Sequence, residues 1–247
     1  MNDDVRSLLI AVAATAVAAL LLGWFLRAHR QDRSLRRLQN FFGLPENSEC
    51  LLVVGRDAGT DGAVGRNDVF ALLELAAAIR NCGAKAQLIS GESAHQGFGE
   101  RTEFCIGGPV VNRRMAAHLH SLLPGVAVNM DTAPGPDRGA FLIGTERYRL
   151  ENGSVEYVLL ARLTAGQEGR PVFLACGQRS VTNQAATRYL AKHHTRLARK
   201  YGSGGNFCLL LKVVNSQAYG PDVVELVKDV TRAATTPQPK LTTSKDL

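Results

Sequence analysis

The first long apolar segment of the chain runs for twenty residues, from Ser7 to Leu26, without a charged side chain. A helix of that length extends roughly 30 Å, which matches the hydrocarbon core of a bilayer. Trp24 and Phe25 stand near its end, where aromatic rings favour the membrane interface. The pattern therefore predicts a transmembrane helix at residues 7–26.

Basic residues follow this segment and set its expected orientation. Between positions 27 and 37 a single acid, Asp32, stands against five arginines: Arg27, Arg30, Arg33, Arg36 and Arg37. Because an excess of Lys and Arg is normally retained in the cytoplasm, we expect residues 1–6 outside the cell and the C-terminal domain inside. A cleaved signal peptide is the alternative, but such a peptide has a basic start and a shorter apolar stretch. The basic juxtamembrane segment, residues 27–44, is expected to contact anionic headgroups of the cell membrane.

Beyond residue 44, short apolar runs alternate with helical patterns. Residues 50–55, CLLVVG, are typical of a strand buried on both faces, and residues 85–89 predict a second strand. Between them, Asn67 or Asp68 is expected to cap a helix that ends near Asn81. The buried stripe of that helix is expected to consist of Val69, Leu72, Leu73, Leu75, Ala76 and Ile79.

The same alternation continues through the domain. Further strands are expected at residues 103–106, 125–128, 171–176 and 207–214, and helices at 111–123, 181–201 and 222–232. Extended runs at 140–143, 148–150 and 156–163 predict an antiparallel meander at one edge. The expected fold class is α/β: a transmembrane helix, then an open, mainly parallel, three-layer sheet that is Rossmann-like at fold level. This domain should span residues 45–233, followed by a disordered tail at 234–247.

Charge and cysteine content narrow the function classes. The formal net charge is +7, and more than half of it lies in the arginine segment, so no nucleic-acid partner is expected. Five cysteines without regular spacing argue against a disulfide framework and favour buried free thiols. The pairs His118 with His120 and His193 with His194 have the wrong spacing for metal ligands, so no metal site is expected.

Three of the predicted buried strands end in glycine followed by polar residues. In an open parallel sheet such ends meet at one edge, where ligands bind in a crevice. Glycine lets the backbone approach a ligand closely, while helix N-termini and arginines attract anions. The expected ligand-binding residues at this edge are Arg56, Gly107, Gly108, Asn112, Arg113, Gly177, Arg179 and Ser180.

The ligand expected at this edge is small and anionic, with nucleotide-like chemistry. Neither the G-x-G-x-x-G fingerprint nor a P-loop ending occurs, and the glycine-rich stretch at 59–65 suits a surface loop or a flexible lid. The leading interpretation is a membrane-anchored sensor or binding module whose cofactor, if any, the sequence does not identify. One alternative is an enzyme that acts on a nucleotide or sugar phosphate through Asp57, Asn112 and Arg179. The other is a membrane-tethered protein-interaction scaffold.

Candidate catalytic residues are few. Asp57 and Asp68 flank the first loop and suit an acid/base pair or a contact to a ribose hydroxyl, although turn and cap roles explain them equally well. Cys105 precedes a predicted helix N-terminus, which would favour a reactive thiolate. Its place inside an apolar strand favours a buried thiol instead.

Overall fold

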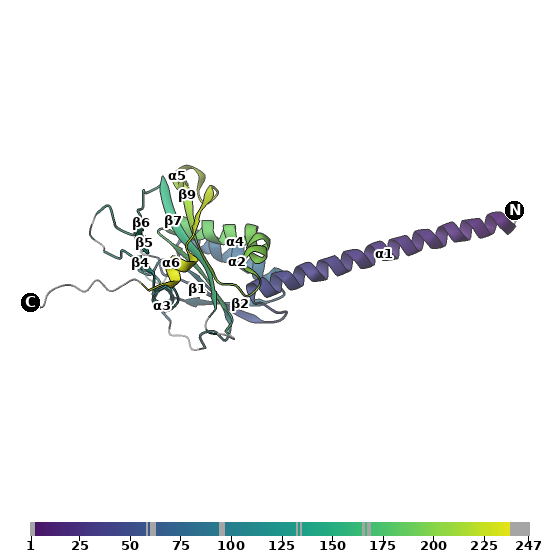
Figure 1. The fold of residues 1–247 in the computed structure, drawn as a ribbon, viewed down its shortest axis with the longest axis horizontal. Helices are drawn as coiled ribbons and strands as arrows, with labels where there is room; N and C mark the ends of the chain where they lie inside the picture. Colours follow the sequence, from purple (N-terminus) through teal and green to yellow (C-terminus); the bar gives the residue numbers. More distant parts are fainter. Residues whose placement is uncertain are drawn as a thin grey trace, which may run out of the picture.

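The fold is that of a computed structural model, which describes residues 3–57, 59, 63–93, 97–131, 133, 135–164, 166 and 169–237. Figure 1 shows an α/β body from which the N-terminal helix projects. Positions 58 and 60–62 of the glycine-rich loop and residues 238–247 of the predicted tail lie outside the described residues. The proposed lid and the disorder of the tail therefore stay predictions.

Helix α1, Asp3–Phe42, is one continuous helix. Among the residues that the structure describes, no helix is both long and apolar enough to cross a membrane. The described side chains of α1 begin at Thr15 and reach Arg27 in fewer than the roughly 20 residues that a crossing needs. Positions 7–14, 18 and 19 of the predicted span lie outside the described side chains. A helix at residues 7–26 is thus confirmed, whereas its transmembrane role is not supported by the described residues.

The end of α1 belongs to the hydrophobic core of the body. Phe41 and Phe42 are fully buried, and their rings pack against Phe173 with centroid distances of 6.0 and 5.5 Å. The buried guanidinium of Arg162 donates a hydrogen bond to the carbonyl oxygen of Phe41 at 3.1 Å. The packed core therefore begins before residue 45, within the basic juxtamembrane segment predicted at residues 27–44.

The main sheet has seven strands in the order β10-β9-β7-β8-β3-β1-β2. Four neighbouring strands are parallel: β2 (Lys85–Ser90), β1 (Glu49–Val54), β3 (Thr102–Ile106) and β8 (Pro171–Gly177). Strand β7 (Val155–Thr164) runs antiparallel to both β8 and β9 (Phe207–Val214). The predicted α/β class and the parallel core are confirmed, in a sheet that is mixed.

The antiparallel meander was predicted wrongly in two respects. Strand β7 lies in the interior of the main sheet instead of at its edge, because it is apolar on both faces and is buried along most of its length. Strands β5 (Phe141–Ile143) and β6 (Glu146–Tyr148) instead pair with β4 (Val126–Val128) in a separate three-stranded sheet. Strand β4 was expected in the main sheet.

The predicted closing helix at 222–232 is also wrong. Its place is taken by the edge strand β10 (Val224–Asp229), which is antiparallel to β9. The connection is short and contains only helix α5 (Ser216–Tyr219) and a turn at Gly220, so it brings the chain back as an antiparallel neighbour. A register shift between Leu226 and Lys228 breaks the strict alternation expected of a strand. Helix α6 (Thr231–Thr235) ends the described domain.

Helices cover both faces of the main sheet. The long helices α2 (Arg66–Asn81) and α4 (Ser180–Tyr201) pack side by side on one face together with the end of α1 (Figure 1). Helix α3 (Arg113–Leu122), α6 and the small sheet cover the other face. Alternate residues of the strands enter the two cores, which gives the three-layer arrangement that the sequence predicted.

Helix α2 faces the core differently from the prediction. It begins after Gly65, without a side-chain cap from Asn67 or Asp68. The positions that it buries are Asp68, Ala71, Leu75 and Ile79. Val69 and Leu73, which were expected in the buried stripe, are exposed. The buried stripe thus includes a carboxylate, which a pattern based on hydrophobicity alone excludes.

Candidate functional site

The three glycine-containing strand ends meet at one edge of the sheet, as the sequence predicted. The backbone nitrogen of Gly55 donates to the carbonyl of Ile106 at 3.2 Å, and that of Gly107 donates to the carbonyl of Ala175 at 3.0 Å. A β-carbon at Gly108 would lie 3.3 Å from the carbonyl oxygen of Gly177. The glycines therefore let the three turns pack closely against one another.

Two of the predicted ligand contacts have other roles at this edge. Asn112 is fully buried, where its Oδ1 accepts a hydrogen bond from the backbone of Met115 and its Nδ2 donates to the carbonyl of Ile106. It caps α3 and has no surface to offer a ligand. Arg113 is highly exposed and pairs with Glu92 at 2.9 Å.

A groove of about 620 Å³ lies beside the strand ends. The start of α2 contributes Arg66, Asn67 and Phe70 to its lining, and α4 and the residue before it contribute Arg179 and Arg188. The opposite wall comes from the turn before β7 and from the α5 region. Of the ligand-binding residues predicted from the sequence, Arg179 lines this groove.

Arg179 is held by a carboxylate that water does not reach. Its Nη1 donates to Glu156 Oε1 at 2.8 Å and to Asn152 Oδ1 at 2.6 Å. Glu156 is fully buried on β7, and its Oε1 also accepts from the backbone nitrogen of Gly153 at 3.0 Å. Within the described part of the chain, Glu156 Oε2 has no hydrogen-bond partner. Burial of this carboxylate therefore depends on Arg179.

The other two arginines of the groove differ in how firmly they are held. Arg188 pairs with Glu74 at 2.8 Å and also with Asp222. No hydrogen bond or ion pair joins Arg66 to another described residue, and its side chain is exposed. Arg66 is consequently the groove cation most available to an incoming anion.

Two carboxylates lie around Gly65, the residue before the groove-lining Arg66 and Asn67. Asp68 is almost fully buried, and its Oδ1 accepts a hydrogen bond from Asn183 Nδ2 at 2.8 Å. Burial raises the pKa of Asp68 to about 6; the hydrogen bond from Asn183 opposes the shift, and the negative charge of Asp57 adds to it. Asp57 accepts a hydrogen bond at Oδ2 from the backbone of Gly59. The charges of Asp57 and Asp68 therefore interact, while their acid/base role stays a prediction.

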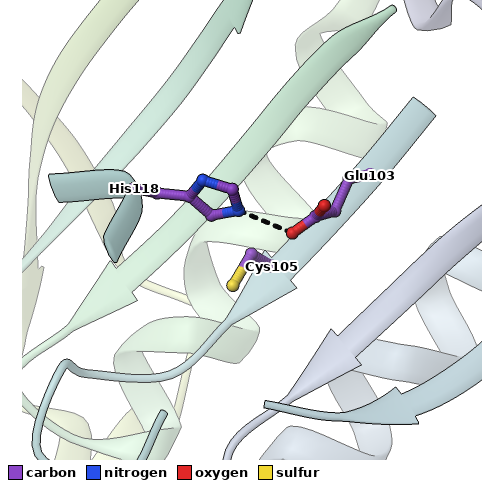
Figure 2. Close-up of side chains that lie close together, drawn as sticks. All are labelled: Glu103, Cys105 and His118. Atoms are coloured by element: carbon purple, nitrogen blue, oxygen red, sulfur yellow. Dashed lines mark hydrogen bonds and ion pairs between the residues drawn. The ribbon is translucent and has the colours of Figure 1, made fainter. Parts of the chain in front are cut away.

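A second polar cluster is buried beneath α3 (Figure 2). Glu103 on β3 accepts hydrogen bonds from Arg114 at 2.6 and 2.7 Å and contacts His118 Nε2 at 2.6 Å. Burial alone would raise the pKa of Glu103, but the bonds from His118 and Arg114 outweigh it and hold the pKa below its ordinary value. Both carboxylate oxygens are therefore engaged by protein donors.

Cys105 lies beside this pair, and atoms of Glu103, Cys105 and His118 that can ligate a metal lie within 4.8 Å of one another. Burial raises the pKa of Cys105 well above that of a free thiol, so it is protonated at neutral pH and a poor nucleophile. The guanidinium of Arg114 already neutralises Glu103, which leaves little affinity for a cation. We interpret the cluster as a structural link between β3 and α3.

Sequence reasoning missed Arg66, Arg188, Glu156 and Asn183. Their contacts join residues from distant parts of the chain, such as Asn183 with Asp68, so no local spacing reveals them. All five cysteines are free and buried, as predicted. Comparison of the chain with protein-family models, with curated proteins and with solved structures gives no match.

Proposed function

We propose that the groove at the strand-end edge binds a small anionic ligand, with a phosphate group as the anion. The observation that carries this proposal is the convergence of Arg66, Arg179 and Arg188 on one hollow of about 620 Å³. Among the described lining residues, three arginines stand against one acid, Asp222. Arg179 and Arg188 are paired with carboxylates, so Arg66 is the cation left for an incoming anion. Guanidinium groups bind phosphate with two parallel hydrogen bonds, which suits such a lining.

Two further features support a nucleotide-like ligand. The ring of Phe70 is 44% exposed at the groove, where a planar base has an apolar face to stack on. Helix α4, which has 22 residues, begins at Ser180 beside Arg179. Its first amide groups carry the partial positive charge that favours an anion at a helix N-terminus.

A thermal-shift screen of the purified full chain tests this proposal. Nucleotides, nucleotide sugars, pyrophosphate and phosphate are the probes, because a ligand well above its dissociation constant raises the melting temperature. Arg66→Ala should then weaken binding of the best probe about tenfold or more, since a charge-assisted hydrogen bond contributes roughly 1.5–3 kcal/mol. Arg113→Ala is the matched control, because Arg113 is exposed and outside the groove lining. Equal weakening by both substitutions, or no stabilising probe, would contradict the assignment.

One observation favours an enzyme as the second candidate function. The pKa of Asp68, raised to about 6, is close to the range in which a carboxylate serves as a general base. An enzyme should turn over the ligand found in the screen, and Asp68→Asn, which removes the proposed base, should abolish turnover while leaving binding measurable. A ligand that binds but stays unchanged after prolonged incubation would exclude the enzyme and support the sensor or binding role.

The membrane address also stays a proposal. It is supported by the uncharged run at residues 7–26, by the arginines that follow it, and by the helical conformation of both. A reporter active only in the cytoplasm, fused after Leu247, should be active, and the protein should sediment with membranes. Recovery of the protein from the soluble fraction, or in a cleaved form outside the cell, would contradict the anchor.

A further inference from the structure

We propose that Asp57 and Asp68 hold a divalent cation of the Mg²⁺ or Mn²⁺ type beside Gly65, next to the groove. The cation would bridge these carboxylates to the phosphate of the bound ligand. The bridging role rests on the function proposed above, whereas the cation site itself stands on separate observations.

The two carboxylates face one small space above Gly65. A β-carbon at Gly65 would lie 3.3 Å from Asp68 Oδ2, 3.6 Å from Asp57 Oδ1 and 3.7 Å from Ser180 Cβ. The backbone of Gly65 has φ −58° and ψ 139°, which any residue adopts, so its conformation does not require glycine. The absent side chain instead leaves room between the two carboxylates.

Asp68 supplies the second, independent observation. Its exposed fraction is 7%, and its Oδ2 accepts no hydrogen bond from any described residue. Asn183 supplies one donor, at Oδ1, and an ionised carboxylate that is this buried is further stabilised by a positive charge at its second oxygen. The negative charge of Asp57 acts on Asp68 and raises its pKa further, so it disfavours the ionised carboxylate and adds to the need for a positive charge. A cation between Asp68 Oδ2 and Asp57 Oδ1 would meet it.

The residues around Asp68 are arranged as the outer support of a metal ligand. Asn183 Nδ2 donates to Asp68 Oδ1, while Asn183 Oδ1 accepts from the backbone nitrogen of Gly177 at 2.8 Å. This second bond fixes the orientation of the amide, which in turn fixes the carboxylate and turns Oδ2 toward Gly65. Hydrogen-bonded second partners of this kind orient ligating carboxylates in metal sites.

The chemistry of the donors selects the cation. Carboxylate oxygens are hard ligands, and no sulfur or imidazole atom is described among the contacts of Asp57 and Asp68. Mg²⁺ is commonly bound through one or two carboxylates, water and the phosphates of a ligand. Asn67 connects the two regions, because it lines the groove and donates to Ser180 Oγ at 3.4 Å. A cation at Gly65 is therefore next to the place where a phosphate would bind.

Mn²⁺ binding to the full chain, stripped of metal with a chelator and followed by electron paramagnetic resonance, tests the site. We expect one Mn²⁺ per chain, displaced by Mg²⁺. Asp57→Asn, Asp68→Asn and Gly65→Ala should each weaken binding at least tenfold, the last by filling the space between the carboxylates. Asp222→Asn is the control, since Asp222 lines the groove and pairs with Arg188. Circular dichroism establishes that each variant is folded, and Gly65→Ala keeps both carboxylates.

The outcomes separate the two proposals, because no anionic ligand is present in this titration. Absence of Mn²⁺ binding, or equal binding by the wild type, Asp57→Asn and Gly65→Ala, would overturn the cation site. Equal loss in Asp222→Asn would overturn it as well, by indicating diffuse attraction to acidic groups. If pyrophosphate still binds without Mn²⁺ and its binding depends on Arg66, the anion-binding groove is supported although the cation site is refuted. Mn²⁺ binding retained in Arg66→Ala supports a site that belongs to the carboxylates.

Discussion

Arg179 Nη1 lies 2.8 Å from Glu156 Oε1, and the two side chains differ completely in their surroundings: Arg179 is 45% exposed at the groove, and Glu156 is not exposed at all. An arginine that the sequence suggested as a ligand contact is therefore also the counter-charge of a buried carboxylate. This relationship decides which substitutions can test the groove.

Arg179→Ala should destabilise the fold by about 3–5 kcal/mol, because it leaves Glu156 charged and buried without its partner. The double variant Arg179→Ala with Glu156→Gln should recover a large part of that loss. Urea unfolding of the three proteins measures the effect. Arg188→Ala is the comparison, since its partners Glu74 and Asp222 are more exposed and the cost should be about 1 kcal/mol. Equal stability of Arg179→Ala and the wild type would refute the dependence of Glu156 on Arg179.

The Glu103 cluster should make the fold sensitive to acid. The pKa of Glu103 is held below its ordinary value of about 4.5, so the unfolded chain takes up this proton at a higher pH than the folded chain does. The stabilisation is thus present above pH ~4.5 and is lost as the pH falls through the folded pKa. Glu103→Gln should lower the free energy of unfolding at pH 7 by about 3–5 kcal/mol and flatten this acid dependence.

The exposed pair of Glu92 with Arg113 provides the matched control for that experiment. Glu92→Gln should change stability by less than about 1 kcal/mol at either pH, because solvent screens a surface ion pair. Thermal unfolding between pH 3 and 7 compares the variants. An unchanged acid profile in Glu103→Gln would show that other carboxylates govern the response.

Gly177→Ala should disturb the ligand edge through packing. A β-carbon there would lie 2.2 Å from Thr182 Oγ1, 2.5 Å from Asn183 Oδ1 and 3.0 Å from the carbonyl of Arg179. Relief of these contacts requires movement of the α4 N-terminus, at a cost of about 1–3 kcal/mol. Gly204→Ala is the matched control, because a β-carbon there would meet no described atom within 4 Å and its φ is not in the left-handed region. A Gly177→Ala protein as stable as the wild type would contradict the packing described here.

Arg162→Lys should loosen the junction between α1 and the body. The buried guanidinium donates to the carbonyl oxygens of Phe41, Gly205 and Ser203, and an ammonium group cannot reproduce that planar set of donors. We expect faster proteolysis near residues 43–47 and a loss of about 2–3 kcal/mol, since one buried and two part-buried carbonyl groups lose a partner. Proteolysis at an unchanged rate would exclude this role of Arg162.

The sequence predicted the elements that depend on local pattern. Strands such as β1, β3 and β8 have continuous apolar runs, and their glycine ends met as expected because parallel strands end at the same edge. Apolar residues at positions 223, 226, 227 and 230 have the spacing of a helix, so a helix was predicted where β10 lies. Hydrogen bonding to β9 outweighs the local preference for a helix. The site was predicted only in part, because Asp68 with Asn183 and Arg179 with Glu156 are pairs that exist only after the sheet has formed.

Helix α1 joins the body at the N-terminal ends of the parallel strands, whereas the groove lies at their C-terminal ends. A β-carbon at Gly43, just after α1, would contact Pro171 and Thr102, which are the first residues of β8 and β3. The groove lies beyond the last residues of the same strands, so the length of the sheet separates the two. If α1 anchors the protein as proposed, the length of the sheet separates the anchor from Arg66, so the proposed ligand would reach the groove directly from open solvent.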